Sequence, residues 1–333
     1  MKESNRLIEF DYIRVAALIG ILICHSCFIY GDIYSRVGRY FSTTFNFLFL
    51  ILSAFLLGFT WKKRGYPQYD SSFLTGRIRK LSQSYYPYLA ILFLFLYLSE
   101  GYLSIKNIIT HLLYLPWFDK INGYDHLWFM TMIVICYFGC WLLSRFQTTF
   151  FKRNSLIYSI LLIGSICVDY IATKHGLPGY MFPYLTGYIF IFSYSSKITT
   201  LITRIPTISN WMQFILVNVF GILMFTHGIF ESNCFVAYLI GMLCAISVFI
   251  FMYKICRSFH SSQFIIWLSG ISFEIYLVHE FFLGKYNVYS IFQNPIAGFL
   301  LLMILSVMAA VFLKFIARKV VTTNKIHIKT PNK

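Results

Sequence analysis

The sequence predicts an all-α polytopic membrane protein with about ten transmembrane helices and with both termini in the cytoplasm. Of its 333 residues, 58% are hydrophobic and only 12% are charged, whereas soluble proteins carry about 25% charged residues. The apolar stretches are about 20 residues long and do not alternate with polar residues. This is typical of membrane helices and unlike the strands of a membrane barrel.

Each apolar stretch predicts one helix. Two of them, 85–98 and 180–195, are short for a hydrocarbon core of ~30 Å. The apolar stretch nearest the N-terminus, 12–30, is too long for a removable signal peptide and has no small-residue cleavage site. The predicted spans are, in order, 12–30, 41–61, 85–98, 127–144, 155–172, 180–195, 211–230, 234–253, 263–283 and 295–317.

We expect residues 1–333 to form a single transmembrane domain that ends in a short basic cytoplasmic tail, residues 318–333. The segment 99–125 is expected on the extracytoplasmic side, with an interfacial helix around Ile105 to Tyr114.

The distribution of basic residues fixes the predicted orientation. Of the 28 Lys and Arg residues, 21 fall in segments that are cytoplasmic when both termini are inside, and 6 fall in the outer loops. Such an asymmetry sets the topology of membrane proteins. The formal net charge of +16 therefore faces anionic membrane lipid, and no nucleic-acid partner is needed to explain it.

The cysteines are expected to be free thiols. Seven of the eight lie within predicted spans, and Cys256 lies just past one on the cytoplasmic side. Cys24 and Cys27 form a C-x-x-C pair, but no second cluster completes the four ligands of a structural zinc site. We interpret the pair as small packing residues, prefer this to a redox or metal centre, and expect no metal.

Polar residues inside the first span carry the strongest functional signal. An ionisable group near the bilayer centre costs about 2.5–3.5 kcal/mol on insertion scales, so each one is a functional candidate. Arg14 and His25 lie eleven residues apart, which places them on one helix face with a separation of about 16 Å. Asp11 lies one turn before Arg14 and is placed to pair with it.

This pattern has two interpretations. In the structural one, Arg14 snorkels to the cytoplasmic surface, and His25 satisfies a carbonyl group on a neighbouring helix. In the functional one, Arg14 binds a phosphate-bearing ligand at the cytoplasmic mouth, and neutral His25 acts as a general base deeper in the membrane. The shared helix face favours the functional interpretation.

Three further groups are candidates. Arg77, Arg79 and Lys80 close a basic cytoplasmic loop. They either mark topology or hold the phosphates of a donor. His126 and Trp128 lie at the start of the fourth span, where Trp128 also suits an aromatic-belt anchor. Glu274, Tyr276 and His279 lie in the outer half of the ninth span, where an anionic Glu274 cannot plausibly face lipid.

Together these residues resemble the acyltransferase-3 family of bacterial integral-membrane O-acyltransferases. The resemblance rests on Glu9-Phe-Asp-Tyr-Ile-Arg14 followed by His25, on His-Leu-Trp-Phe at 126–129, and on Ser-Phe-Glu-Ile-Tyr-Leu-Val-His at 272–279. These motifs occur in the family's order along nearly the whole chain. The resemblance implies an enzyme of the bacterial cytoplasmic (inner) membrane.

The family's activity implies transfer of an acyl group, most often acetyl, from cytoplasmic acyl-CoA to a hydroxyl of an envelope glycan or lipid-linked sugar. By position, His25 corresponds to the catalytic histidine, Arg14 to its paired arginine, and Arg77 with Lys80 to a cytoplasmic basic pair. The family commonly has Arg-x-x-Arg with a closely following proline; here the fourth residue is Lys80, and Pro87 follows seven residues later. We add Glu274 to the candidate catalytic residues.

The implied chemistry suits the residues. A thioester is already activated, so the protein must hold it beside an acceptor hydroxyl and remove that proton, which histidine does well near neutral pH. Tyr276 and Trp128 are candidate donors to the oxyanion. Two other classes stay open, a transporter or flippase of a polar metabolite or lipid-linked saccharide, and a non-catalytic scaffold of an envelope polysaccharide complex.

Overall fold

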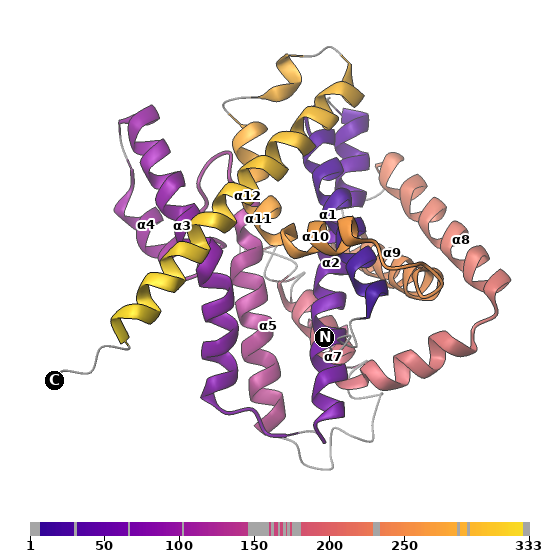
Figure 1. Cartoon of the computed structure of the whole chain (residues 1–333). Coiled ribbons are helices and arrows are strands. Elements are labelled where there is room, and N and C mark those ends of the chain that lie inside the picture. Colours follow the sequence, from indigo (N-terminus) through magenta and orange to yellow (C-terminus); the bar gives the residue numbers. More distant parts are fainter. Residues whose placement is uncertain are drawn as a thin grey trace. The chain divides into compact units, whose positions relative to one another are not determined.

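Helices make up most of the described part of the chain, and no strand occurs there. Two compact units are distinguished, one formed by residues 1–69 and 139–270, the other by 70–138 and 271–333. Figure 1 traces the helices along the chain. The computed structural model describes residues 7–29, 32–65, 67–101, 103–145, 160, 163–165, 167, 168, 171, 174, 181–228, 234–284, 287–291 and 294–328.

The first unit is organised around one long helix, α2, which packs against α1, α7, α8 and α9, while α10 packs on α1. Small residues allow the close approach of these helices. A side chain at Gly20 would strike the ring of Phe45, and one at Gly58 would strike the carbonyl oxygen of Phe192. The helices of this unit are α1 (Ile8–Cys27), α2 (Asp32–Lys63), α7 (Met181–Arg204), α8 (Thr207–Thr226), α9 (Cys234–Cys256) and α10 (Gln263–Gly270).

In the second unit, α12 packs against α3, α11, η2 and η3. The helix α5 (Trp128–Arg145) is divided between the units: residues 128–138 belong to this unit, and residues 139–145 belong to the first. The helices are α3 (Ser71–Glu100), α4 (Ile105–Leu112), η1 (Asp125–Leu127), α11 (Ser272–Val278), η2 (His279–Phe282), η3 (Val288–Ser290) and α12 (Pro295–Ile328).

The ends of α3 follow capping rules. The carboxylate of Asp70 accepts hydrogen bonds from the backbone N–H groups of Ser72 and Phe73, which have no partner within the first turn of a helix. A further hydrogen bond from the Ser72 hydroxyl is the main cause that lowers the pKa of Asp70. At the other end, Gly101 has φ 69°, a conformation that glycine adopts without strain.

The membrane character of the chain is confirmed. Within the described residues, seven helices are long and apolar enough to cross a membrane, or eight if α10 and α11 form one span. Most of the stretch 155–172 lies outside those residues. The stretch 180–195 is helical in α7, but α7 is not among the seven because polar residues follow from 193 to 200. The total of ten spans and the orientation of the termini stay predictions.

Two boundaries differ from the sequence expectation. The stretch 263–283 is not one helix, because α10 ends at Gly270 and α11 begins at Ser272. Glycine is a poor residue for a helix interior, and hydropathy alone does not register such a break. The short stretch 85–98 belongs to α3, whose 30 residues extend about 45 Å. A helix, α4, is present where the interfacial helix is expected, and its place at the membrane surface stays a prediction.

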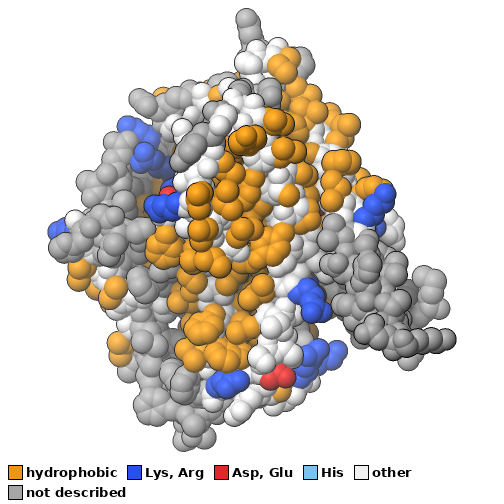
Figure 2. All heavy atoms as spheres, turned by 90° about the vertical axis from the view of Figure 1, so that its left-hand side faces the viewer, with side chains coloured by type: hydrophobic (Ala, Val, Ile, Leu, Met, Phe, Trp, Pro, Cys, Tyr) orange, Lys and Arg blue, Asp and Glu red, His pale blue; other side chains and the backbone are white. Residues whose placement is uncertain are grey.

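Large apolar side chains remain exposed on the helices. Figure 2 shows hydrophobic side chains over a broad area of one face, with Lys and Arg toward its margins. A soluble protein rarely exposes a contiguous apolar area of this kind, whereas a lipid bilayer solvates it. On α3 and α12 these exposed side chains are Tyr86, Ile91, Leu94, Tyr97, Leu98, Ile296, Leu300, Ile304, Met308, Val311, Phe312 and Phe315.

Candidate active site

The residues that open α1 form a polar cluster with α10. The hydroxyl of Ser269 donates to Asp11 Oδ1 at 2.6 Å and accepts from Arg14 Nη1 at 2.9 Å. The expected pair of Asp11 and Arg14 is present, with Nη1 and Oδ1 3.7 Å apart. Ser269 therefore connects the carboxylate and the guanidinium and fixes how the guanidinium is turned.

Burial differs between the two charged groups of this cluster. The Asp11 side chain is 5% exposed and that of Arg14 is 31% exposed. A buried carboxylate needs a nearby cation and hydrogen-bond donors to remain ionised, and Arg14 and Ser269 supply both. Arg14 is therefore held by a buried anion while part of its side chain reaches the surface.

His25 lies in the last turn of α1, on the same face of an uninterrupted helix as Arg14. Its ring is half-buried and contacts Phe28 edge-to-face, with ring centroids 6.5 Å apart. Gly38 of α2 lies against this turn, since a Cβ there would lie 3.1 Å from the Cys24 carbonyl oxygen. The close packing of α2 therefore supports the part of α1 that carries His25.

The basic cluster at the start of α3 contains two kinds of environment. Arg77 is half-buried, and its guanidinium carbon lies 5.6 Å and 5.8 Å from the ring centroids of Phe73 and Tyr137. Arg79 and Lys80 are exposed. Arg77 and Lys80 are three residues apart and share a helix face, whereas Arg79 is turned by about 200° from Arg77. The cation–π contacts stiffen Arg77 in particular.

Glu274, near the start of α11, is paired with Ser84, which sequence reasoning did not select. Its Oε1 accepts a hydrogen bond of 2.8 Å from the hydroxyl of Ser84 on α3. Both side chains are buried. This bond connects α11 to α3 and supports the expectation that Glu274 does not face lipid.

His126, Tyr276 and His279 come together at the end of α11. The Tyr276 hydroxyl donates to the His126 carbonyl oxygen, and the two histidine ring centroids lie 5.0 Å apart. His126 Nε2 is 3.2 Å from the Leu277 carbonyl oxygen, and His279 Nδ1 is 2.7 Å from the Tyr276 carbonyl oxygen. All three residues are candidates from the sequence, but their proximity depends on contacts between residues that are about 150 positions apart in the chain.

The carbonyl contacts set the tautomers of these histidines. A carbonyl only accepts, so the contacting nitrogen carries the hydrogen, Nε2 in His126 and Nδ1 in His279. The basic nitrogen of neutral His279 is therefore Nε2, which lies 3.8 Å from Glu280 Oε1. This geometry makes His279 a second candidate base in the described chain.

Trp128 packs within the protein. Its ring contacts Trp117 edge-to-face at 5.4 Å between centroids, and the backbone N–H of Trp117 donates to the Thr131 hydroxyl at 3.2 Å. These contacts hold the loop after α4 against α5. The role of Trp128 as an oxyanion donor stays a prediction.

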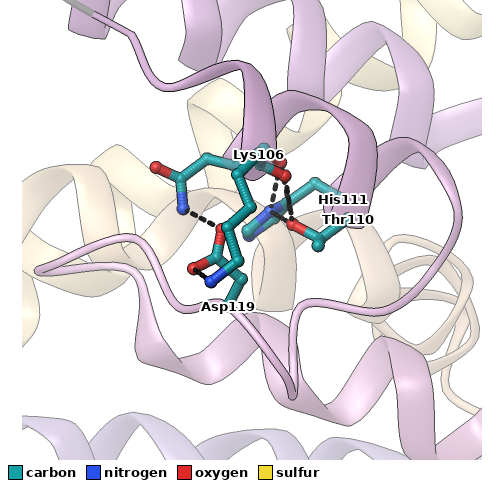
Figure 3. Close-up of polar contacts among 5 residues, drawn as sticks. Lys106, Thr110, His111 and Asp119 are labelled. Atoms are coloured by element: carbon teal, nitrogen blue, oxygen red, sulfur yellow. Dashed lines mark hydrogen bonds and ion pairs between the residues drawn. The ribbon is translucent and has the colours of Figure 1, made fainter.

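A second polar cluster stabilises the same loop from α4 (Figure 3). Asp119 accepts from Asn107 Nδ2 at 2.8 Å and lies 3.1 Å from Lys106 Nζ. The buried ring of His111 contacts the Asn107 carbonyl oxygen through Nδ1 at 2.8 Å. Burial lowers the pKa of His111. The cluster fixes the segment that leads into η1 and His126.

None of the seven described cysteines forms a disulfide bond with another of them, as expected. Sequence reasoning did not identify Ser269 or Ser84, because serine is common in membrane helices and neither residue belongs to a charged motif. Ser269 carries one signal, the Ser-Gly-Ile-Ser sequence at 269–272 that interrupts the ninth apolar stretch.

A comparison with protein families assigns the chain. Residues 7–315 match a family model described as an acyltransferase domain. No curated protein matches the chain, and no solved structure does. The matched range contains every candidate residue described above.

Proposed function

The chain belongs to this acyltransferase-3 family, and from that premise we propose that it moves an acyl group, with acetyl expected, from cytoplasmic acyl-CoA to a hydroxyl of an envelope glycan or lipid-linked sugar. The observation that carries the proposal is the arrangement on α1, where Arg14 is oriented by Asp11 and Ser269 on the helix face that also carries His25. The bacterial inner membrane is the proposed location.

Arg14 is proposed to bind a phosphate of the CoA moiety. A guanidinium presents five N–H donors in a fixed plane, and a planar fork of this kind recognises phosphate oxygens well. Asp11 balances the charge of Arg14. The cluster therefore contributes an oriented guanidinium to phosphate binding, and not a net positive charge. Arg77 and Lys80 add cations at the start of α3, with Arg79 on another face of that helix.

His25 is proposed as the general base. A ring nitrogen of neutral His25 accepts the proton of the acceptor hydroxyl while the hydroxyl oxygen forms a bond to the thioester carbonyl carbon. The C–S bond then breaks, and the CoA thiolate leaves and takes up a proton. Trp128 is a candidate for donating to the oxyanion. The one hydrogen of the Tyr276 hydroxyl is directed to the His126 carbonyl oxygen, so Tyr276 is proposed to position His126. Glu274, a candidate catalytic residue, is proposed as a positioning residue through Ser84.

The proposal is tested with detergent-purified full-length protein, acetyl-CoA and a membrane glycolipid extract that supplies acceptor hydroxyls. Release of CoA without any membrane gradient is expected of an acyltransferase and not of a transporter or a scaffold. Mass analysis of envelope glycans from cells with and without the protein then identifies the substituent, expected to add the mass of one acetyl group. Glycans of identical mass in the two strains, together with no CoA release in vitro, would refute the proposal.

A further inference from the structure

An apolar cavity lies in the second unit, between α3, η2 and α12. Its volume is about 310 Å³, within the range of small-molecule binding sites. The side chains around it are almost entirely hydrocarbon and aromatic. They are Tyr88, Ile91, Phe95, Val278, Phe281, Phe282, Ala309, Phe312 and Leu313.

The cavity opens toward the lipid-facing side of its helices. Ile91 and Phe312 line it and are 39% and 61% exposed. Both belong to the exposed apolar side chains of α3 and α12, of the kind that Figure 2 shows gathered on one face. In a bilayer, the molecules that reach such an opening are lipids, so the cavity is accessible to a hydrocarbon chain from the side.

One polar group lies inside this apolar wall. The hydroxyl of Tyr88 is buried and has no hydrogen-bond partner among the described residues, and the whole side chain is 1% exposed. Leaving a buried hydroxyl unpaired is unfavourable. A ligand that supplies an oxygen atom at this position removes that penalty.

The wall of the cavity is continuous with a polar segment. Phe281 and Phe282 belong to η2, which begins with His279 and Glu280. Glu280 directly precedes Phe281 in η2, so its carboxylate lies beside this wall of the cavity. A carboxylate accepts hydrogen bonds from hydroxyl groups and repels a phosphate, so an uncharged, hydroxyl-bearing head group suits this end of the cavity.

We propose that this cavity binds the hydrocarbon tail of an uncharged, hydroxyl-bearing membrane lipid, a glycolipid in its chemistry, and that this lipid presents the hydroxyl that is acylated. The second half of this inference rests on the proposed function. Tyr88 donates to an oxygen at the junction of head and tail, and Glu280 accepts from head-group hydroxyls.

The test uses full-length protein in lipid nanodiscs and two photoreactive probes with a diazirine in the tail, a dodecyl glucoside and a phosphatidylglycerol. The glucoside probe is expected to label peptides that contain Phe95 or Leu313, and excess unlabelled dodecyl glucoside should reduce that labelling at least five-fold. Labelling by phosphatidylglycerol that is equal and equally specific would show a groove for bulk lipid and overturn the proposal.

Two variants and a control make the test specific. Ala309→Phe fills the cavity and should lower glucoside labelling several-fold, whereas Met308→Phe, on the exposed face of the same helix, should not. Tyr88→Phe removes only an unpaired oxygen, so it should leave thermal stability unchanged or higher and still weaken labelling. Undiminished labelling in both Ala309→Phe and Tyr88→Phe would refute the site.

CoA release from acetyl-CoA, measured on the same preparations, separates the two claims. CoA release by the wild type without specific tail labelling refutes this inference alone. Specific labelling without CoA release by the wild type refutes the proposed function and leaves the lipid site standing.

Discussion

Replacing Ser269 by alanine tests whether the cluster on α1 serves donor binding. The substitution removes the hydroxyl that accepts from Arg14 at 2.9 Å and donates to Asp11 at 2.6 Å. The ion pair itself, at 3.7 Å, remains possible, so the charge of Arg14 is kept while the orientation of its guanidinium is lost.

The size of the effect follows from these contacts. A hydrogen bond to a charged group contributes about 1.5–3 kcal/mol, which corresponds to roughly 10- to 150-fold in an equilibrium constant. Arg14 is 31% exposed, so solvent screens the interaction and the lower end applies. We expect Ser269→Ala to raise KM for acetyl-CoA about 10-fold and to leave kcat nearly unchanged.

The assay is CoA release at varied acetyl-CoA concentration, with protein amounts matched. Ser269→Thr keeps the hydroxyl and should restore most of the affinity. Ser258→Ala serves as the control, because the Ser258 hydroxyl is exposed and, within the described part of the chain, its one hydrogen bond goes to the Ile255 carbonyl oxygen at 2.7 Å. An unchanged KM in Ser269→Ala, or an equal loss in Ser258→Ala, would refute the role of this cluster in donor binding.

Three further predictions concern stability and topology. Gly58→Ala should lower the thermal stability in detergent, by about 1–3 kcal/mol in unfolding free energy, because its Cβ strikes a backbone carbonyl of α7. Gly76→Ala, which meets nothing within 4 Å, should be neutral or stabilising. Burial lowers the pKa of His111, so the unfolded chain binds a proton that the folded chain does not. Stability should therefore fall as the pH drops below about 6.5, and a melting temperature in His111→Phe that depends equally on pH would contradict this assignment. In a background without native cysteines, a cysteine at Asn107 should react with an impermeant thiol reagent added outside cells, and one at Ser71 should not; equal labelling at both positions would contradict the orientation.

Local sequence patterns predicted the features that depend on neighbours in the chain. The Asp11–Arg14 pair follows from the spacing of one helical turn, and α4 lies in the segment between two spans where a helix was expected. Both require only the helix period and the cost of placing charge in hydrocarbon.

Contacts between distant segments were not predictable in this way. The partner of Arg14 and Asp11 is a serine 255 and 258 residues away, and the partner of Glu274 is a serine 190 residues away. A single sequence gives the polarity of such residues but not which helices pack together. The break at Gly270 was also missed, because a hydropathy average extends across one glycine.

The measurement that tests the central claim most directly compares acyl transfer by three single variants, His25→Ala, His126→Ala and His279→Ala, at matched protein levels. A general base contributes about 10²–10⁴ in rate. We expect His25→Ala to lose at least 100-fold in transfer rate while its affinity for acetyl-CoA changes little. If His25→Ala retained most of its rate while His279→Ala lost its own, the base would be His279, whose Nε2 faces Glu280, and the assignment of α1 as the catalytic helix would be wrong.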